Sequence, residues 1–107
     1  ESDCDAVISV AEITAGHPIQ AKKIVDGQLT YYCIEEKEGM RRQDCQPPAY
    51  LRNGAIYLTR RDVLMRTDSI WGKVTVPYIM PEERSVNIDR RIDFKLAEVM
   101  LQERAQP

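Results

Sequence analysis

The segment from Ser85 to Asp93 places side-chain oxygens at alternate positions. Because side chains alternate along an extended chain, Ser85, Asn87 and Asp89 would present their oxygens on one side. Oxygen ligands suit a hard cation such as Mg²⁺, which proteins usually hold with one or two carboxylates while phosphate and water complete the shell. From spacing alone a structural interpretation stays open, in which Asp89 simply caps the helix that follows.

A second polar group precedes this segment. Arg42 and Arg52 could hold a carboxylate through paired N–H donors. Asn53 and Gly54 then enter an apolar stretch that reaches Tyr57, and a glycine in a strand often marks a close approach by a ligand or another backbone. The alternative is a surface pair of arginines and a tight entry to the strand.

The other reactive side chains are few. His17 precedes a proline in a loop-like stretch, and no catalytic triad can be assembled with confidence around a single histidine. The cysteines, Cys4, Cys33 and Cys45, form no Cys-x-x-Cys pair, so we expect free thiols in a reducing cytoplasm. A zinc site would lack a fourth ligand at a recognisable spacing.

Several short elements must position these groups. Residues 6–13 are apolar and β-branched, which predicts a buried strand. Residues 21–25 and 28–33 flank Asp26-Gly27, the usual signal for a hairpin, because glycine accepts the positive φ that a type I′ turn demands. Residues 34–48 are polar, charged and end in proline, which predicts a loop.

The clearest element is the last. From Arg90 to about Arg104 apolar side chains recur at helical spacing, with Asp89 as a reasonable N-cap and Asp93 near the first turn, where negative charge suits the helix dipole. Strands mixed with helices indicate the α/β class. The helix face comprises Ile92, Leu96, Val99 and Met100, and the elements expected before it are a strand over 49–59, a helix over 60–66, a strand over 73–80 and an extended piece over 84–88.

Composition limits the possible functions. The 107 residues suffice for one small domain, and the formal net charge of −2, with both signs mixed, leaves no footprint for nucleic acid or an acidic membrane surface. No apolar run approaches the roughly 18 residues needed to span a bilayer, and the acidic start does not resemble a signal peptide. Because a strand begins almost at once and no initiating methionine is present, we expect a piece of a longer, cytoplasmic protein.

Taken in order, these groups resemble the second half of the acylneuraminate cytidylyltransferases, the CMP-sialic acid synthetases and their relatives for legionaminic and pseudaminic acid. The family shows a Ser-Val strand before a His-Pro loop, a hairpin, an Arg-Gln pair, an aromatic residue before Asn-Gly-Ala-Ile-Tyr, and a Ser-x-Asp-Ile-Asp-x-x-x-Asp segment that opens the final helix. The match covers nearly the whole chain. The corresponding stretches are Ile8 to Val10, His17-Pro18, Arg42-Gln43, Tyr50, Asn53 to Tyr57, Ser85 to Asp93, and Ala97-Glu98.

The resemblance implies an α/β fold, the C-terminal half of a Rossmann-like nucleotide-diphospho-sugar transferase, present as a single partial domain over 1–107. Residues 17–50 would form a hairpin and loop excursion that reaches a partner subunit in a homodimer. The implied reaction is attack of an acidic sugar's anomeric hydroxyl on the α-phosphate of CTP, releasing pyrophosphate. Mg²⁺ would neutralise phosphate charge in that reaction.

The resemblance also implies roles for individual residues. Asp89 would be a catalytic, metal-binding carboxylate. Asn87 stands where the family has the first Asp of Asp-Ile-Asp, and an amide is a neutral and weaker Mg²⁺ ligand. Gln20 replaces a lysine that often follows His-Pro, which leaves the identity of the sugar open. The residues implied to bind the acceptor sugar are Gln20, Arg42, Asn53, Tyr57 and Trp71.

The family's CTP-binding loop, rich in glycine, arginine and lysine, has no counterpart, since the five glycines here are isolated. We therefore expect that this chain alone does not turn over CTP. The alternative function is a non-catalytic module that keeps the fold and either binds a sugar or serves as an assembly surface.

Overall fold

The computed structural model describes residues 3–105. The chain divides into two compact units, one formed by the residues up to 11 together with those from 52 onward, the other by residues 12–51. We refer to them as the sheet unit and the hairpin unit. No helix within residues 3–105 is both long and apolar enough to cross a bilayer.

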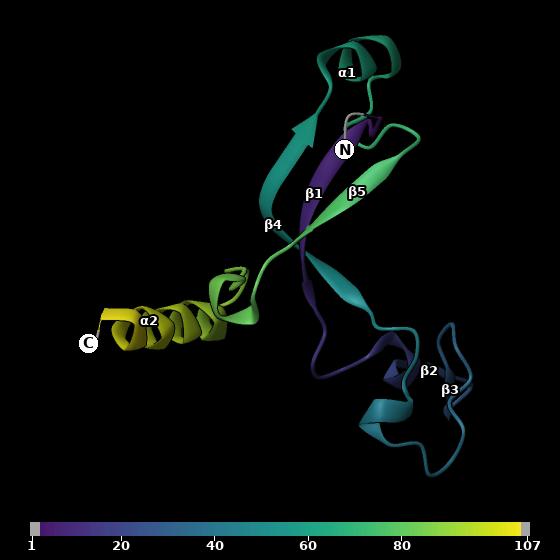
Figure 1. Cartoon of the computed structure of the whole chain (residues 1–107). Helices are drawn as coiled ribbons and strands as arrows, with labels where there is room; N and C mark the ends of the chain where they lie inside the picture. Colours follow the sequence, from purple (N-terminus) through teal and green to yellow (C-terminus); the bar gives the residue numbers. More distant parts are fainter. Residues whose placement is uncertain (1–2, 106–107) are drawn as a thin grey trace. The chain divides into compact units, whose positions relative to one another are not determined.

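The sheet unit is built on three strands in the order β4–β1–β5 (Figure 1). β1 spans Ala6–Glu12 and pairs in parallel with β5, Thr75–Ile79. β4 spans Tyr50–Thr59 and runs opposite to β1 (Figure 1). The strands expected over 6–13, 49–59 and 73–80 are therefore confirmed, with slightly shorter bounds.

The apolar core of the sheet unit is small. Ala6 and Ile8 of β1 are buried, and so is Val63 in α1. This helix spans Arg61–Thr67, one residue later than the predicted 60–66. β-Branched residues in β1 suit a pleated, buried surface. Among these apolar residues lies Ser9, whose side chain is also fully buried.

The long helix α2 spans Arg91–Ala105, close to the predicted bounds. The prediction that Asp89 is its N-cap is wrong. The carbonyl of Arg90 accepts the first helical hydrogen bonds, from the N–H groups of Asp93 and Phe94, so Arg90 occupies the N-cap position. The Asp93 carboxylate satisfies the exposed start of the helix, because it accepts hydrogen bonds from the N–H groups of Asp89 and Arg90.

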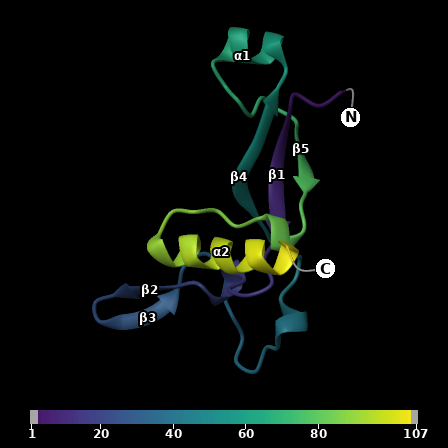
Figure 2. The ribbon, with the colours of Figure 1, turned by 90° about the vertical axis from the view of Figure 1, so that its left-hand side faces the viewer.

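The segment between β5 and α2 is also not wholly extended as predicted. A 3₁₀ turn, η3, spans Glu82–Arg84 and takes in the first residue of the expected stretch 84–88. The N–H of Arg84 donates to the carbonyl of Pro81, and the N–H of Ser85 donates to that of Glu82. These hydrogen bonds turn the chain just before the segment 85–89. α1 lies at the end of the sheet where β4 finishes and β5 begins, whereas η3 and α2 follow β5 at the other end (Figures 1 and 2).

The hairpin unit contains the predicted two-stranded hairpin. β2, Lys22–Val25, pairs antiparallel with β3, Gln28–Tyr31. Asp26 and Gly27 connect them with φ values of 53° and 78°, as a type I′ turn requires. Between the end of β1 and the start of β4, the rest of this unit is loop, as predicted for 34–48, apart from two 3₁₀ turns, η1 at Pro18–Gln20 and η2 at Arg42–Asp44.

Candidate functional site

The site begins with an irregularity in β4. Gly54 has φ +76°, a left-handed conformation that residues other than glycine rarely adopt. Such a residue inside a strand is typical of a β-bulge, which interrupts the regular ladder of backbone hydrogen bonds. The N–H of Ile56 accordingly donates to the side-chain Oγ of Ser9, at 2.8 Å.

Asn53 connects this bulge to the rest of the sheet unit. Its Oδ1 accepts hydrogen bonds from Ser9 Oγ at 2.6 Å and from the N–H of Ala55 at 3.2 Å. Its Nδ2 donates to Ser85 Oγ at 3.1 Å and contacts Met80 Sδ at 3.4 Å. The amide orientation follows from these partners, because the reverse orientation would point Nδ2 at the Ala55 N–H.

The segment 85–89 carries the predicted oxygen ligands. Ser85 Oγ donates to the carbonyl of Pro81 at 2.9 Å, and Asn87 Nδ2 donates to Asp89 Oδ2 at 3.0 Å. Asn87 Oδ1 lies 3.6 Å from the position that a Cβ on Gly54 would occupy. Contacts therefore join Asn53 and Gly54 to this segment. We call Ser9, Asn53, Ser85, Asn87 and Asp89 the Asn53 cluster.

The Asp93 carboxylate holds the C-terminal end of this segment through its hydrogen bonds with Asp89 and Arg90. The pKa of Asp93 is lowered chiefly because the Arg90 side chain donates a hydrogen bond to its carboxylate, and secondarily because the N–H of Asp89 does. The same hydrogen bond raises the pKa of Arg90. Asp93 is therefore ionised at neutral pH and serves the helix start, which leaves Asp89 as the carboxylate within the cluster.

The cluster fits Mg²⁺ in part. Asp89 offers a carboxylate and Asn87 an amide oxygen, and both are hard ligands of the kind this ion prefers. Asn87 presents its Nδ2 to Asp89, so its oxygen would have to turn to share a cation with that carboxylate. Within residues 3–105 no group of three or more His, Cys, Asp or Glu side chains is arranged to hold a metal. Phosphate and water would have to complete the shell.

Tyr57 lies on β4 beyond the bulge. Its hydroxyl accepts a hydrogen bond from Arg52 Nη1 at 2.8 Å. In a regular strand these two side chains would point to opposite faces, and the extra residue of the bulge lets them meet. Arg52 is thereby directed to Tyr57. The suggested pairing of Arg52 with Arg42 stays a prediction, because the Arg42 side chain lies outside the described part of the structure.

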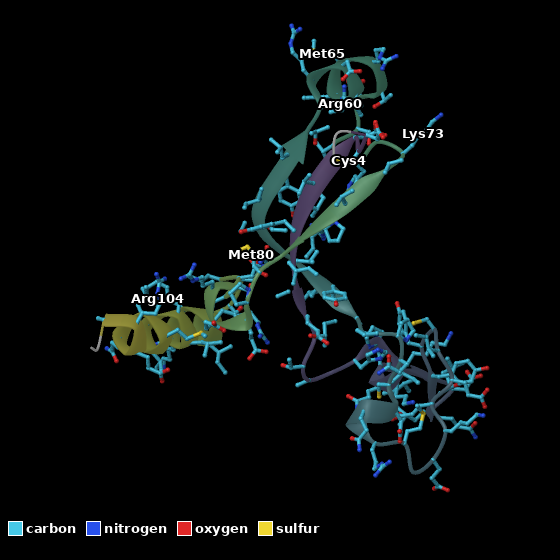
Figure 3. The ribbon with its side chains drawn as sticks, viewed as in Figure 1. Cys4, Arg60, Met65, Lys73, Met80 and Arg104 are labelled. Carbon is cyan, nitrogen blue, oxygen red and sulfur yellow. The ribbon has the colours of Figure 1, made fainter. Side chains whose placement is uncertain are left out.

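Trp71 lies away from the Asn53 cluster. It precedes β5, whereas Asn87 and Asp89 follow that strand, and five residues of strand span about 16 Å. Figure 3 shows these two ends through Lys73 and Met80, which flank β5. The structure therefore does not bring Trp71 together with Asp89 within this unit.

The loop that carries Trp71 is tightly held. Ser69 Oγ accepts the N–H groups of Trp71 and Gly72, and Thr75 donates to the Trp71 carbonyl. Asp5 accepts the N–H groups of Lys73 and Val74, and the Lys73 hydrogen bond is the main reason that the pKa of Asp5 is lowered. A Cβ at Gly72 would collide with Asp5, so glycine is needed for this approach.

The remaining predicted residues belong to the hairpin unit. Gln20 lines an open pocket of about 700 Å³ together with His17, Gln43 and Gln46. His17 Nδ1 accepts the N–H of Ile19, which leaves Nε2 protonated and able to donate to the Pro47 carbonyl at 2.9 Å. This histidine is therefore a structural link between two turns of the unit. The backbone of Arg42 lies in η2, and its side chain falls outside the described part of the structure.

Comparison with known proteins yields several relatives, although no family model matches the chain. The "N-acylneuraminate cytidylyltransferase" of Streptococcus agalactiae is 34% identical over 92 residues, which cover 86% of this chain and 22% of that protein. The "CMP-N,N'-diacetyllegionaminic acid synthase" of Campylobacter jejuni is 35% identical over 69 residues, or 64% of this chain and 29% of that protein. The "Post-translational flagellin modification protein B" of Campylobacter coli is 38% identical over 83 residues, or 77% of this chain and 34% of that protein.

The chain belongs to the acylneuraminate cytidylyltransferase family. The recognition made from ordered motifs is thereby confirmed. The chain spans about a third or less of the length of each of these three relatives.

The sequence motifs do not predict the hydrogen bond between Ser9 and Asn53. They include Ser9 only as part of a Ser-Val pair. A signal was present, because a serine within an apolar, buried strand needs a hydrogen-bond partner. The sequence could not say that the partner would be Asn53, 44 residues away.

Proposed function

We propose that this chain is the sugar-binding and dimerising part of a CTP-dependent cytidylyltransferase, which forms a CMP-activated acidic sugar of the sialic acid type and releases pyrophosphate. The observation that carries the proposal is the similarity to a cytidylyltransferase and a CMP-legionaminic acid synthase over most of the chain. Asn87, whose Oδ1 lies near Gly54, and Asp89, which accepts the Asn87 amide, support it with hard oxygen ligands of the kind that this chemistry uses.

The proposed fold is the C-terminal half of a Rossmann-like nucleotidyltransferase in a cytoplasmic enzyme. The parallel pairing of β1 with β5 supports this proposal, since parallel neighbours are typical of such folds. A second part of the enzyme would supply the CTP-binding loop, and this chain alone would be inactive. The chain buries few apolar residues and exposes many large apolar side chains, which is in keeping with a partial domain.

In the proposed reaction, Asp89 provides the metal-binding carboxylate, with the Asn87 oxygen as an additional ligand after its amide turns. Mg²⁺ would neutralise the charge that develops on the phosphates as the anomeric hydroxyl attacks the α-phosphate of CTP. The role of the chain is to hold the Asp89 carboxylate in place, with Asp93 fixing the backbone N–H of Asp89.

We propose that Tyr57 faces the acceptor sugar from β4, that Asn53 lies behind this site and serves it without bonding the sugar directly, and that Gln20, Arg42 and Trp71 complete the sugar site. Gln20 already lines a pocket in the hairpin unit. Trp71 lies beyond the far end of β5, so its contribution would be to a sugar site other than the one next to Asp89 in the same chain. Exchange between subunits of a dimer is one arrangement that permits this.

We propose that residues 17–50 make the homodimer contact. They lie within the hairpin unit, and the hairpin exposes Ile24 and Leu29 at 75% and 71% of their surface. Two apolar side chains opposite one another on an isolated two-stranded hairpin are costly to leave in water, and a partner subunit would cover them.

The decisive experiment measures pyrophosphate release by the full-length protein with CTP, Mg²⁺ and a panel of sialic, legionaminic and pseudaminic acids and Kdo. We expect turnover with at least one sugar and a loss of about a hundredfold in Asp89→Asn. Asp26→Asn makes the same chemical change in the hairpin turn and should leave turnover unchanged. Wild-type protein that is inactive with every sugar would refute the proposal.

A second candidate function is a non-catalytic module of the same fold, which binds a sugar or serves assembly. The observation that favours it is the amide of Asn87, which donates to Asp89 where a second metal-binding carboxylate would strengthen the site. Asn87→Asp in the full-length protein distinguishes the two. A strong rise in Mg²⁺-dependent pyrophosphate release indicates a weakened catalytic site, and no change favours the module.

A further inference from the structure

Two chains of hydrogen bonds meet at the side-chain amide of Asn53. The Ile56 N–H donates to Ser9 Oγ, and Ser9 in turn donates to Asn53 Oδ1. On the other side of the amide, Asn53 Nδ2 donates to Ser85 Oγ, which donates to the Pro81 carbonyl. Each serine hydroxyl has one hydrogen to donate. Ser85 donates it to Pro81, and Ser9 has Asn53 Oδ1 at 2.6 Å as its near acceptor and the Ile56 carbonyl at 3.3 Å as a longer one, so every group has a compatible partner.

This arrangement uses the hydrogen-bonding groups of Asn53 within the protein. Its Oδ1 accepts twice, its two Nδ2 hydrogens face Ser85 and Met80, and 8% of the residue surface is exposed. A direct bond from Nδ2 to a sugar would require the amide to leave partners in a buried environment, where a lost hydrogen bond is costly. The geometry favours an indirect role.

The segment 85–89 is held at both of its ends. Asn53 holds Ser85, and the Asp93 carboxylate holds the N–H of Asp89. Between these points, Asn87 donates to Asp89 and lies against Gly54. A change at Asn53 therefore reaches Asp89 through a short, contiguous path, although the two side chains share no hydrogen bond of their own among those described.

We infer that Asn53 is a positioning residue, which with Ser9 and Ser85 locks the bulge of β4 to the segment 85–89 and so orients the Asp89 carboxylate. The part of this inference that concerns metal binding by Asp89 rests on the proposed function. The part that concerns the position of residues 85–89 rests only on the hydrogen bonds described above.

Amide hydrogen–deuterium exchange of the full-length protein, without metal or CTP, tests the segment directly. In Ser85→Ala and Asn53→Ala we expect the N–H groups of residues 85–89 to exchange about tenfold faster, because a buried partner is lost. Thr67→Val removes a hydrogen bond from Thr67 Oγ1 to the Val63 carbonyl in α1 and serves as the matched control, with unchanged exchange over 85–89. Ser85→Thr keeps the hydroxyl and should restore wild-type exchange.

Direct binding of Mn²⁺, as a paramagnetic probe for the Mg²⁺ site, tests the consequence. We expect about tenfold weaker binding in Ser9→Ala, Asn53→Ala and Ser85→Ala, with little further loss when Ser85→Ala is added to Asn53→Ala. The Michaelis constant for the sugar should stay unchanged in all three variants. If Asn53→Ala alone raises that constant, Asn53 contacts the sugar and the inference is overturned.

The two proposals fail in different ways. Wild-type protein that binds no Mn²⁺ would remove the proposed metal chemistry, while faster exchange over 85–89 would still support the positioning role. Unchanged exchange over 85–89 in folded Ser85→Ala would overturn the positioning role even in an active enzyme. Ser85 is only partly buried, so this variant should fold even if Asn53→Ala does not.

Discussion

The Asn53 cluster and the β2–β3 hairpin are held by different forces. In the cluster, side chains separated by tens of residues satisfy one another's polar groups, and Ser9 has no exposed surface. In the hairpin, backbone pairing and a local turn define the shape, while Ile24 and Leu29 remain open to solvent. The comparison indicates that the cluster satisfies its own polar groups without a ligand, whereas the hairpin leaves apolar side chains exposed.

The largest expected effect comes from Gly54→Val. A valine would be forced into a left-handed backbone, which costs about 1–3 kcal/mol, and its branches would reach toward Asn87. Gly39→Val is the matched control, because Gly39 has φ +86° but nothing within 4 Å of the position that its Cβ would occupy. Urea unfolding should show a greater loss for Gly54→Val. Equal losses would mean that the bulge is no more constrained than an exposed loop.

Ser9→Ala tests whether the cluster is a stabilising network. The change leaves the Ile56 N–H without its acceptor and removes a donor to Asn53, so we expect the free energy of unfolding to fall by about 1–3 kcal/mol. Ser69→Ala removes a serine that accepts two backbone N–H groups, whereas Ser9 accepts one, but Ser69 lies in a partly exposed loop where water can replace it. A smaller loss is expected there, measured by the same denaturation. A reversed order would contradict the contrast between buried and exposed networks.

Replacing both Ile24 and Leu29 by threonine probes the hairpin surface. Threonine keeps a high strand propensity, and because both side chains are exposed the unfolding free energy of the separated subunit should change by less than about 0.5 kcal/mol per site. If the hairpin makes the dimer contact, the dissociation constant should rise by at least about tenfold, as measured by light scattering over a dilution series. An unchanged dimer would place the subunit contact elsewhere.

The pH dependence of protein stability tests whether Asp93 holds the start of α2, next to the Asn53 cluster. The pKa of Asp93 is lowered in the folded state, so its contribution to stability is present above the ordinary value of 3.8 and is lost as the pH falls through the lower, folded value. Stability of the wild type should therefore decline in this acid range more steeply than that of Asp93→Asn. Denaturation followed by circular dichroism between about pH 2 and 5, at about half-unit steps, compares the two. Parallel curves would show that Asp93 does not stabilise the start of the helix.

The smallest effect is expected for the ion pair between Lys22 and Glu36, whose atoms approach to 2.7 Å in the hairpin unit. Both side chains are about a quarter exposed, so solvent weakens the attraction and we expect a coupling energy of about 0.5 kcal/mol. A double-mutant cycle with Lys22→Met and Glu36→Gln measures it, and added salt should reduce it. A coupling several times larger would mean that side chains order the hairpin unit as strongly as they order the cluster.

Local signals in the sequence predicted most of the secondary structure. The Asp26-Gly27 turn, the apolar strands and the periodic helix depend on neighbouring residues, and each is present in the structure. The errors lie where two local solutions compete. Asp89 and Asp93 can both serve a helix start, and only the structure shows Asp93 accepting the two N–H groups while Asp89 pairs with Asn87.

Short-range patterns and ordered motifs along the chain were enough to predict the α/β class, the family and the residue types available for chemistry. The folded chain was needed to show that Asn53 bonds to both Ser9 and Ser85, and that Trp71 lies at the opposite end of β5 from Asp89. The physical reason is that a β-bulge and a turn after β5 bring distant residues together, and neither the partner of a buried hydroxyl nor the register of a strand can be inferred from neighbouring residues alone.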